Sequence, residues 1–149
     1  MWCLVISWQV VQLFVPGGDE AMAEDAGKTI LVADDSATSR LMIKTRLAMQ
    51  GYRVIEAASG AEAVQVATAE SPALLMLDFF LGDMTAPEVL TALRADAATQ
   101  GLPVIVLSGN DSEDDRSACE ALGLSGFLIK PYEPDVLLEK VKEALGDTG

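Results

Sequence analysis

The sequence contains no histidine, and this absence excludes several kinds of active site. Without histidine there is no Ser-His or Cys-His nucleophilic pair, no histidine-bound zinc and no phosphohistidine donor. Cysteine is nearly absent too, since Cys3 and Cys119 are the only two and lack the C-x-x-C spacing of metal and redox sites. Any chemistry must therefore rest on carboxylates, hydroxyls and lysine. So little cysteine also fits a reducing, cytoplasmic setting.

Basic residues are scarce as well. The chain has 10 lysines and arginines and 23 acidic residues, which gives a formal net charge of -13 at pH 7. Because a nucleic-acid backbone is bound by clustered Lys and Arg, we expect no nucleic acid among the partners, and expect proteins or cations instead. The chain of 149 residues, 50% of them hydrophobic, is long enough for one ordinary domain and too short for two comfortable ones.

The first 27 residues differ in kind from the rest of the chain. They are almost entirely apolar from Trp2 to Val15, and Pro16 and Gly17 end this run. The run is shorter than the roughly 20 residues of a membrane helix, and no basic residue precedes it as in a secretory signal. We expect an extension that is disordered or reflects a misplaced gene start, with translation beginning at Met22. A tail that binds a membrane surface or a partner is the alternative; we predict no membrane association.

From Thr29 onward, short apolar runs alternate with longer amphipathic segments, which is typical of βα units around a parallel sheet. We expect strands at 29–33, 52–56, 73–77, 103–107 and 125–129, and helices near 37–50, 60–71, 87–96, 112–123 and 134–145. The last helix is expected to bury Leu138, Val141 and Leu145 along one face. Residues 28–146 are thus predicted to form one doubly wound α/β domain, with no second domain attached.

Chemically active side chains follow four of these strands. Asp34 and Asp35 end the first strand, Asp78 the third, Ser108 the fourth and Lys130 the fifth. Each feature alone is commonplace, but in a doubly wound sheet all of them lie at the edge where ligands bind. Two carboxylates about 4 Å apart repel by roughly 4 kcal/mol at an effective dielectric near 20, so three need a cation or bound protons. Mg²⁺ suits them, because it prefers carboxylate and phosphate oxygens.

This set of residues also suits phosphoryl transfer. A carboxylate can act as a nucleophile toward phosphorus, and a bound metal ion neutralises the charge that develops. Lys130 would pair with one phosphoryl oxygen and the hydroxyl of Ser108 would donate to another.

Taken together, the motifs resemble the response-regulator receiver family, in particular its single-domain members in chemotaxis and cell-cycle signalling. The resemblance covers about Lys28 to Leu145. It rests on the segments Ile30-Leu31-Val32-Ala33-Asp34-Asp35-Ser36, Leu75-Met76-Leu77-Asp78, Val104-Ile105-Val106-Leu107-Ser108-Gly109 and Gly126-Phe127-Leu128-Ile129-Lys130-Pro131.

The resemblance implies a flavodoxin-like fold of five parallel strands and five helices, and a role for each residue at the sheet edge. It makes Asp78 the phosphoacceptor, Asp35 a direct ligand of Mg²⁺ and Asp34 a ligand through water. It further implies that the backbone carbonyl of Phe80 completes the metal site, that Ser108 and Lys130 contact the phosphoryl group, and that Phe127 is the aromatic switch. A cis peptide bond is expected between Lys130 and Pro131.

The same resemblance implies a signalling function rather than an enzyme. The chain would be a stand-alone response regulator that takes its phosphoryl group from a sensor histidine kinase, a phosphotransfer protein or a small phosphodonor, and assists its own phosphorylation and dephosphorylation. A downstream protein would bind the fourth helix, fifth strand and fifth helix. The residues expected on that surface are Arg116, Glu120, Phe127, Ile129, Leu137 and Lys140.

Two other functions are compatible with such a fold. A receiver-like docking scaffold would act without phosphorylation, although its usual mark is loss of the acids or the lysine. A phosphatase with an aspartate nucleophile would carry a second acid two residues later, where this chain has Phe80. The loop itself departs from the family pattern, since Leu81-Gly82-Asp83 replaces the common Met-Pro-Gly, so the resemblance identifies the acceptor but does not extend to the loop geometry or the phosphoryl lifetime.

Overall fold

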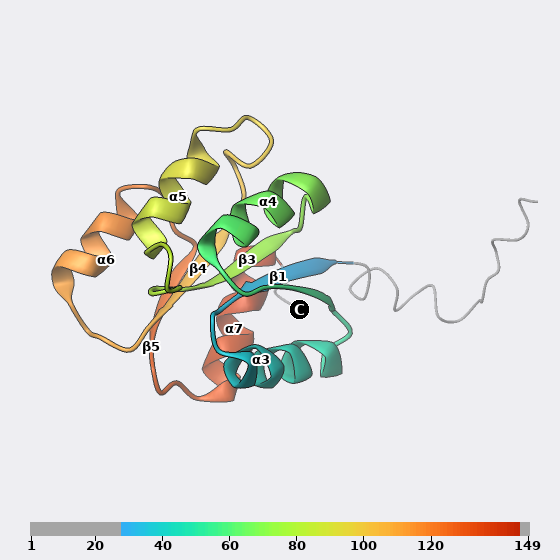
Figure 1. The fold of residues 1–149 in the computed structure, drawn as a ribbon. Helices are drawn as coiled ribbons and strands as arrows, with labels where there is room; N and C mark the ends of the chain where they lie inside the picture. The colour runs from blue at the N-terminus through green and yellow to red at the C-terminus, as the bar shows by residue number, and fades with distance from the viewer. Residues whose placement is uncertain (1–27, 147–149) are drawn as a thin grey trace, which may run out of the picture.

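Residues 28–146 are described by the computed structural model and form a single five-stranded parallel sheet with helices on both faces (Figure 1). The strand order is β2-β1-β3-β4-β5, so the order reverses between β1 and β3. This confirms the predicted doubly wound α/β fold; the expectation for residues 1–27 lies outside the described residues. The elements are β1 (Thr29–Ala33), α3 (Ala37–Met49), β2 (Arg53–Ala57), α4 (Gly60–Glu70), β3 (Leu74–Asp78), α5 (Ala86–Arg94), β4 (Val104–Ser108), α6 (Glu113–Glu120), β5 (Gly126–Ile129) and α7 (Pro134–Leu145).

Two apolar layers hold the helices against the sheet. On one face, α4, α5 and α6 pack through residues such as Ala63, Leu90 and Cys119. On the other, α3 and α7 pack through Leu47 and Val141. The central strands β1, β3 and β4 are buried on both faces, which explains why their sequences are continuous apolar runs.

Serine hydroxyls cap the start of three of the described helices. Ser36 accepts a hydrogen bond from the backbone N–H of Ser39, and Ser59 accepts one from that of Glu62. Ser112 does the same for Asp115 at the start of α6. The predicted strand and helix limits accordingly agree with the structure to within about two residues at most ends, because caps and turns are local signals.

The expected buried face of α7 is confirmed for Val141, but the deepest leucine of this helix is a different one from those expected. Leu137, rather than Leu138, packs into the core together with Val141, which follows it by four residues, and Leu137 is only 1% exposed. Leu138 and Leu145 pack at the margin of the same layer, half-buried. Leu137 lies four residues and Leu138 three residues before Val141, and both spacings are typical of one helix face, so only contact with the sheet decides which residue points inward.

Arg94 connects the end of α5 to the loop before β4 and to the turn after α6 through hydrogen bonds. From the last turn of α5 its guanidinium donates hydrogen bonds only to backbone carbonyls, those of Thr99, Gln100, Leu102, Leu122 and Gly123. These carbonyls belong to the loop before β4 and the turn after α6. The planar fork of an arginine can serve several acceptors at once, which a lysine ammonium cannot do in the same plane.

We therefore expect Arg94→Lys to lower the free energy of unfolding by about 2 kcal/mol, since charge-assisted hydrogen bonds contribute roughly 1.5–3 kcal/mol each and are partly replaced by water. Urea unfolding followed by circular dichroism measures this loss. Arg53→Lys, on the exposed side of β2, is the matched control and should change stability by less than about 0.5 kcal/mol. Equal stability of the two variants would show that the Arg94 contacts are dispensable.

Candidate functional site

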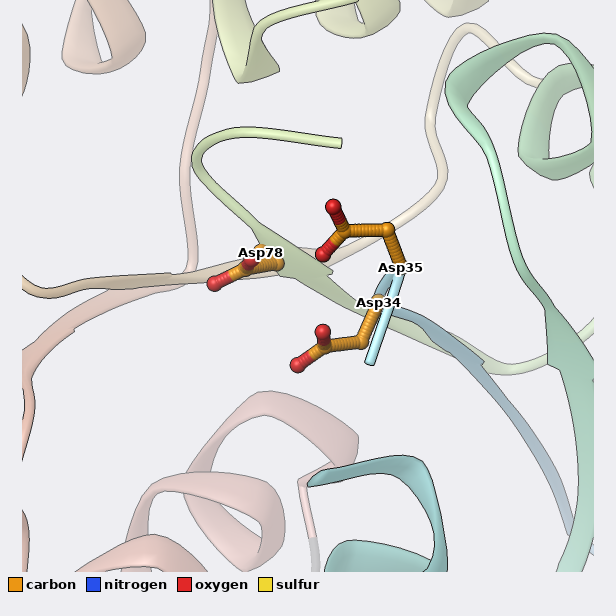
Figure 2. Close-up of side chains that lie close together, drawn as sticks. All are labelled: Asp34, Asp35 and Asp78. Atoms are coloured by element: carbon orange, nitrogen blue, oxygen red, sulfur yellow. The ribbon is translucent and has the colours of Figure 1, made fainter. Parts of the chain in front are cut away.

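Three carboxylates meet at the carboxyl end of the sheet. Asp34 and Asp35 follow β1 and Asp78 ends β3, the two neighbouring strands at which the strand order reverses. One oxygen of each lies within 4.8 Å of the others, and Figure 2 shows the three side chains gathered around one space. The exposure differs across the cluster, since Asp34 is buried, Asp78 half-buried and Asp35 exposed. The cluster is thus open to solvent on the Asp35 side.

Asp34 has the most unusual surroundings of the three. Its side chain is 2% exposed; Oδ1 accepts a hydrogen bond from the backbone N–H of Ser36 at 2.9 Å, whereas Oδ2 accepts none. Burial raises the pKa of Asp34, the Ser36 hydrogen bond opposes this, and the nearby charge of Asp78 adds to the rise. A buried carboxylate oxygen without a hydrogen-bond donor is costly, so this position favours a cation or a proton.

Lys130, which follows β5, brings a positive charge to the same place. Its Nζ donates to Asp78 Oδ1 at 2.7 Å and lies 3.8 Å from Asp34 Oδ2. Burial by itself lowers the pKa of Lys130, but the hydrogen bond to Asp78 and the charges of Asp78 and Asp34 outweigh it, and the pKa is raised. The ammonium therefore stays charged and neutralises part of the cluster.

Ser108 lies at the end of β4, 1% exposed, and its hydroxyl closes a local turn. Oγ donates to the carbonyl of Asn110 at 3.0 Å and accepts from the N–H of Asn110 at 3.1 Å. The backbone N–H of Lys130 donates to the Ser108 carbonyl at 2.7 Å, which fixes the ends of β4 and β5 side by side. The expected cis peptide bond between Lys130 and Pro131 is present.

The two aromatic residues singled out in the sequence lie in different surroundings. Phe127 in β5 is half-buried, and the guanidinium carbon of Arg116 from α6 lies 4.9 Å from its ring centroid, a cation–π contact. Phe80 is 61% exposed, and its ring meets that of Phe79 edge-on with centroids 5.0 Å apart. Of the residues expected on the partner-binding surface, Leu137 does not belong there, because it is buried in the core beneath α7.

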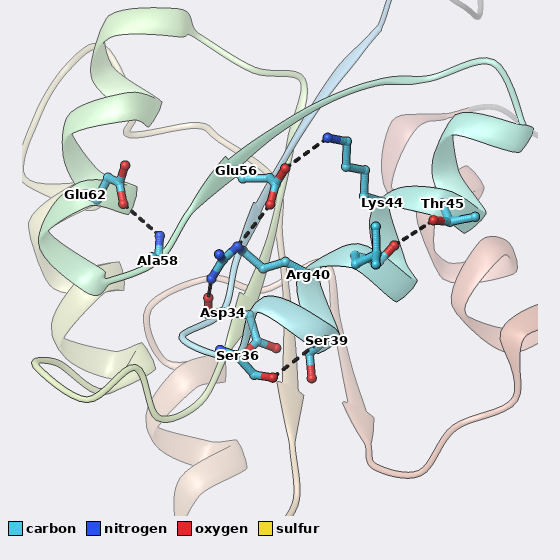
Figure 3. A network of polar contacts seen from close by, with 10 residues as sticks. Asp34, Ser36, Ser39, Arg40, Lys44, Thr45, Glu56, Ala58 and Glu62 are labelled. Carbon is cyan, nitrogen blue, oxygen red and sulfur yellow. Dashed lines mark hydrogen bonds and ion pairs between the residues drawn. The ribbon is translucent and has the colours of Figure 1, made fainter.

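Arg40 is a supporting residue that the sequence did not reveal. From α3, its Nη1 donates to the backbone carbonyl of Asp34 at 2.6 Å, while Nε pairs with Glu56 of β2 at 3.0 Å (Figure 3). Lys44 pairs with the other Glu56 oxygen at 3.1 Å, and Glu56 has a lowered pKa because of Lys44 and then Arg40. The network fixes the backbone that presents Asp34 and Asp35. No sequence signal marks it, because its partners are 6 and 16 residues away.

The burial of Asp34 beside the other acids has a measurable cost in stability. The pKa of Asp34 is raised in the folded state above its unfolded value of about 3.9. Protonated Asp34 therefore contributes to the free energy of unfolding in full below about pH 3.9, and this contribution is lost as the pH rises through the folded-state pKa. At pH 7 without divalent cations, Asp34→Asn should therefore raise the free energy of unfolding by about 1 kcal/mol, or roughly 4 °C in Tm. Scanning calorimetry in EDTA tests this, with the exposed Asp111→Asn as control. A less stable Asp34→Asn protein would contradict it.

Comparison with known proteins agrees with this geometry. A family model for the response regulator receiver domain matches residues 30–142. The phosphate regulon transcriptional regulatory protein PhoB of Pseudomonas aeruginosa is 34% identical over 123 residues, which cover 83% of this chain and 54% of that protein. The chain spans about half the length of the first curated relatives it matches, and the expected stand-alone arrangement stays a prediction.

Solved structures agree on the fold. The chemotaxis protein CheY4 of Vibrio cholerae matches with a TM-score of 0.75 and 30% identity, over 79% of this chain and 98% of that one. The receiver domain of the sensor histidine kinase PA1611 of Pseudomonas aeruginosa PAO1, with a magnesium ion coordinated in its active-site cleft, also matches. Its TM-score is 0.74 and its identity 26%, over 80% of this chain and 98% of that one.

None of the helices in the described residues is long and apolar enough to cross a bilayer. The chain belongs to the response regulator receiver domain family of two-component signalling systems.

Proposed function

We propose that the chain accepts a phosphoryl group on Asp78 in a magnesium-dependent reaction and that this switches a protein-binding surface. The donor would be a sensor histidine kinase, a phosphotransfer protein or a small phosphodonor in the cytoplasm. The observation that carries the proposal is the meeting of Asp34, Asp35 and Asp78 within 4.8 Å, with Lys130 bound to Asp78 at 2.7 Å. Receiver domains are signalling proteins, and this constellation supplies what phosphoryl transfer needs.

The residues present fit Mg²⁺. The three carboxylates offer hard oxygen ligands, and the buried Asp34 Oδ2, which accepts no hydrogen bond, leaves an acceptor available for a cation or its water. Asp35 and Asp78 would hold the ion directly, Asp34 through water, and the backbone carbonyl of Phe80 would complete the set. A related receiver domain carries magnesium in its cleft, which supports the assignment. When bound, the ion would neutralise the acids and the charge that develops on the phosphoryl oxygens.

The proposed reaction begins with the carboxylate of Asp78 as nucleophile. One of its oxygens attacks the phosphorus, the bond from phosphorus to the donor nitrogen or oxygen breaks, and an acyl phosphate forms. Lys130, which neutralises Asp78 before the reaction, would keep its charge and turn to a phosphoryl oxygen. Ser108 would exchange its hydrogen bond to the Asn110 carbonyl for one to another phosphoryl oxygen. Both residues thus need only local rearrangements.

The switched surface is proposed on α6, β5 and α7. Phe127 would be the aromatic switch residue, and Arg116, Glu120, Ile129 and Lys140 would lie around it, without the buried Leu137. The downstream target would be a protein, because the excess of acidic residues disfavours nucleic acid. Neither a phosphorylation-independent scaffold nor a phosphatase is favoured: the acids and the lysine converge, and Phe80 supplies no second acid.

Magnesium is expected to stabilise the folded domain, because the folded state gathers the acids and the unfolded chain does not. At 100 times its dissociation constant the gain is about 2.7 kcal/mol. Thermal unfolding with and without magnesium measures this, and Asp35→Asn should remove most of the shift while Asp111→Asn keeps it. If millimolar magnesium leaves the Tm of the unmutated protein unchanged, the metal site is wrong.

Asp78→Asn should abolish labelling by acetyl phosphate or by a cognate kinase and leave the fold intact, because an amide is nearly isosteric but a far poorer nucleophile. Intact-mass spectrometry detects the phosphoryl adduct directly. Lys130→Ala should reduce signalling more than it reduces stability. A phosphoryl adduct that persists in the Asn variant would show that another residue is the acceptor.

A further inference from the structure

The loop that follows Asp78 is a short hairpin rather than an open connection. Ala86 N–H donates to the Phe79 carbonyl at 2.8 Å, Phe80 and Thr85 form an isolated antiparallel bridge, and Leu81 N–H donates to the Met84 carbonyl at 3.0 Å. Gly82 and Asp83 are therefore the two residues at the tip. Gly82 has a φ of +88°, which suits glycine at a tight turn.

Asp83 at this tip binds the N-terminus of a helix that lies more than twenty residues earlier in the chain. Its Oδ1 accepts from the backbone N–H of Gly60 at 2.8 Å and its Oδ2 accepts from that of Ala61 at 3.0 Å. The next N–H, that of Glu62, is taken by Ser59 Oγ. These hydrogen bonds lower the pKa of Asp83, Gly60 first and then Ala61. One carboxylate of the loop thus satisfies the first two free N–H groups of α4, where a negative charge is also favoured.

A close packing contact reinforces this attachment on one side of Asp83. A Cβ on Gly60 would lie 2.6 Å from the Cβ of Met84, so the loop sits directly against the bare backbone at the start of α4. On the other side of Asp83, the loop passes the acid cluster. A Cβ on Gly82 would lie 3.8 Å from Asp35 Oδ2. The attached tip and the acid cluster are therefore immediate neighbours along the chain.

We infer that Asp83 is a positioning residue for the metal and phosphoryl site: it anchors the hairpin of residues 79–86 to α4 and so holds the Phe80 carbonyl and Gly82 beside Asp35 and Asp78. The inference rests on the proposed function, because Phe80 matters only if that site binds magnesium. Without the anchor the hairpin keeps its internal hydrogen bonds and the packing of its buried residues, but its tip loses the polar attachment that fixes its distance from the acids. Magnesium would then have to order the loop on binding, and its affinity falls.

The test compares Asp83→Ala with Glu62→Ala. Glu62 is a matched control, because it is also an acid at the start of α4 and accepts a backbone hydrogen bond, from Ala58 N–H at 2.8 Å. This hydrogen bond does not involve the hairpin of residues 79–86. Both variants should lose stability in urea unfolding without magnesium. Isothermal titration calorimetry with magnesium alone should show about tenfold weaker magnesium binding for Asp83→Ala, which is the lower end of the loss seen when a residue that supports a metal ligand is removed. For Glu62→Ala the magnesium affinity should fall less than about twofold.

Asp83→Asn is the second variant, since it retains an oxygen acceptor for one N–H and should lie between the wild type and Asp83→Ala. Labelling by acetyl phosphate provides a second readout: the magnesium concentration at half-maximal rate should rise about tenfold in Asp83→Ala, whereas the rate at saturating magnesium recovers. Equal magnesium affinity in wild type and Asp83→Ala would overturn the inference alone. A wild type that neither binds magnesium nor forms the adduct would overturn the proposed function, and the inference with it.

Discussion

Mutual repulsion of three carboxylates is the constraint on which the arrangement of this site depends. Asp34, Asp35 and Asp78 are brought together because β1 and β3 are neighbours in a parallel sheet and end at the same edge. The chain offsets this repulsion only partly, with the ammonium of Lys130 against Asp78 and, at a longer distance, Asp34, and with one backbone N–H donated to Asp34. Such a site is destabilising in the absence of a cation, and under the proposed function this uncompensated charge would favour binding of a divalent ion to the folded state.

Repelling groups stay together only if the backbone that carries them is held from outside. Two anchors of this kind are present, on opposite sides of the cluster. Arg40 binds the Asp34 carbonyl from α3, and Asp83 binds α4 from the loop after Asp78. Both are charge-assisted contacts to backbone groups, which are stronger than neutral hydrogen bonds. Both anchors act on backbone groups rather than on the three carboxylates, so they constrain the geometry of the site without occupying its carboxylate oxygens.

The sequence was informative where the determinant was local or followed from topology. Apolar strands, hydroxyl caps such as Ser36 and Ser112, and the acids at strand ends all depend on short segments, and the parallel sheet then places the strand ends together. The sequence could not distinguish Leu137 from Leu138, because both continue the same helical spacing and only the orientation of α7 on the sheet separates them. The roles of Arg40 and Asp83 were missed for a related reason, because each binds a partner that becomes adjacent only after folding. The local sequence around a charged residue is the same whether or not the fold brings such a partner to it.

The route from the acid cluster to the surface can be traced through paired strands. Ser108 pairs with Ile129 and Val106 with Phe127 in the β4–β5 register, and the Lys130 N–H binds the Ser108 carbonyl. Through this pairing the end of β4 that carries Ser108 lies beside β5, with Phe127 two residues before its partner Ile129. Phe127 is not held by the core alone, since Arg116 of α6 lies over its ring. A cation–π contact at such a partly exposed site contributes about 0.5–1 kcal/mol, so it adds only modestly to the packing that holds the ring. Under the proposed function, this contact would link the proposed switch residue Phe127 to α6.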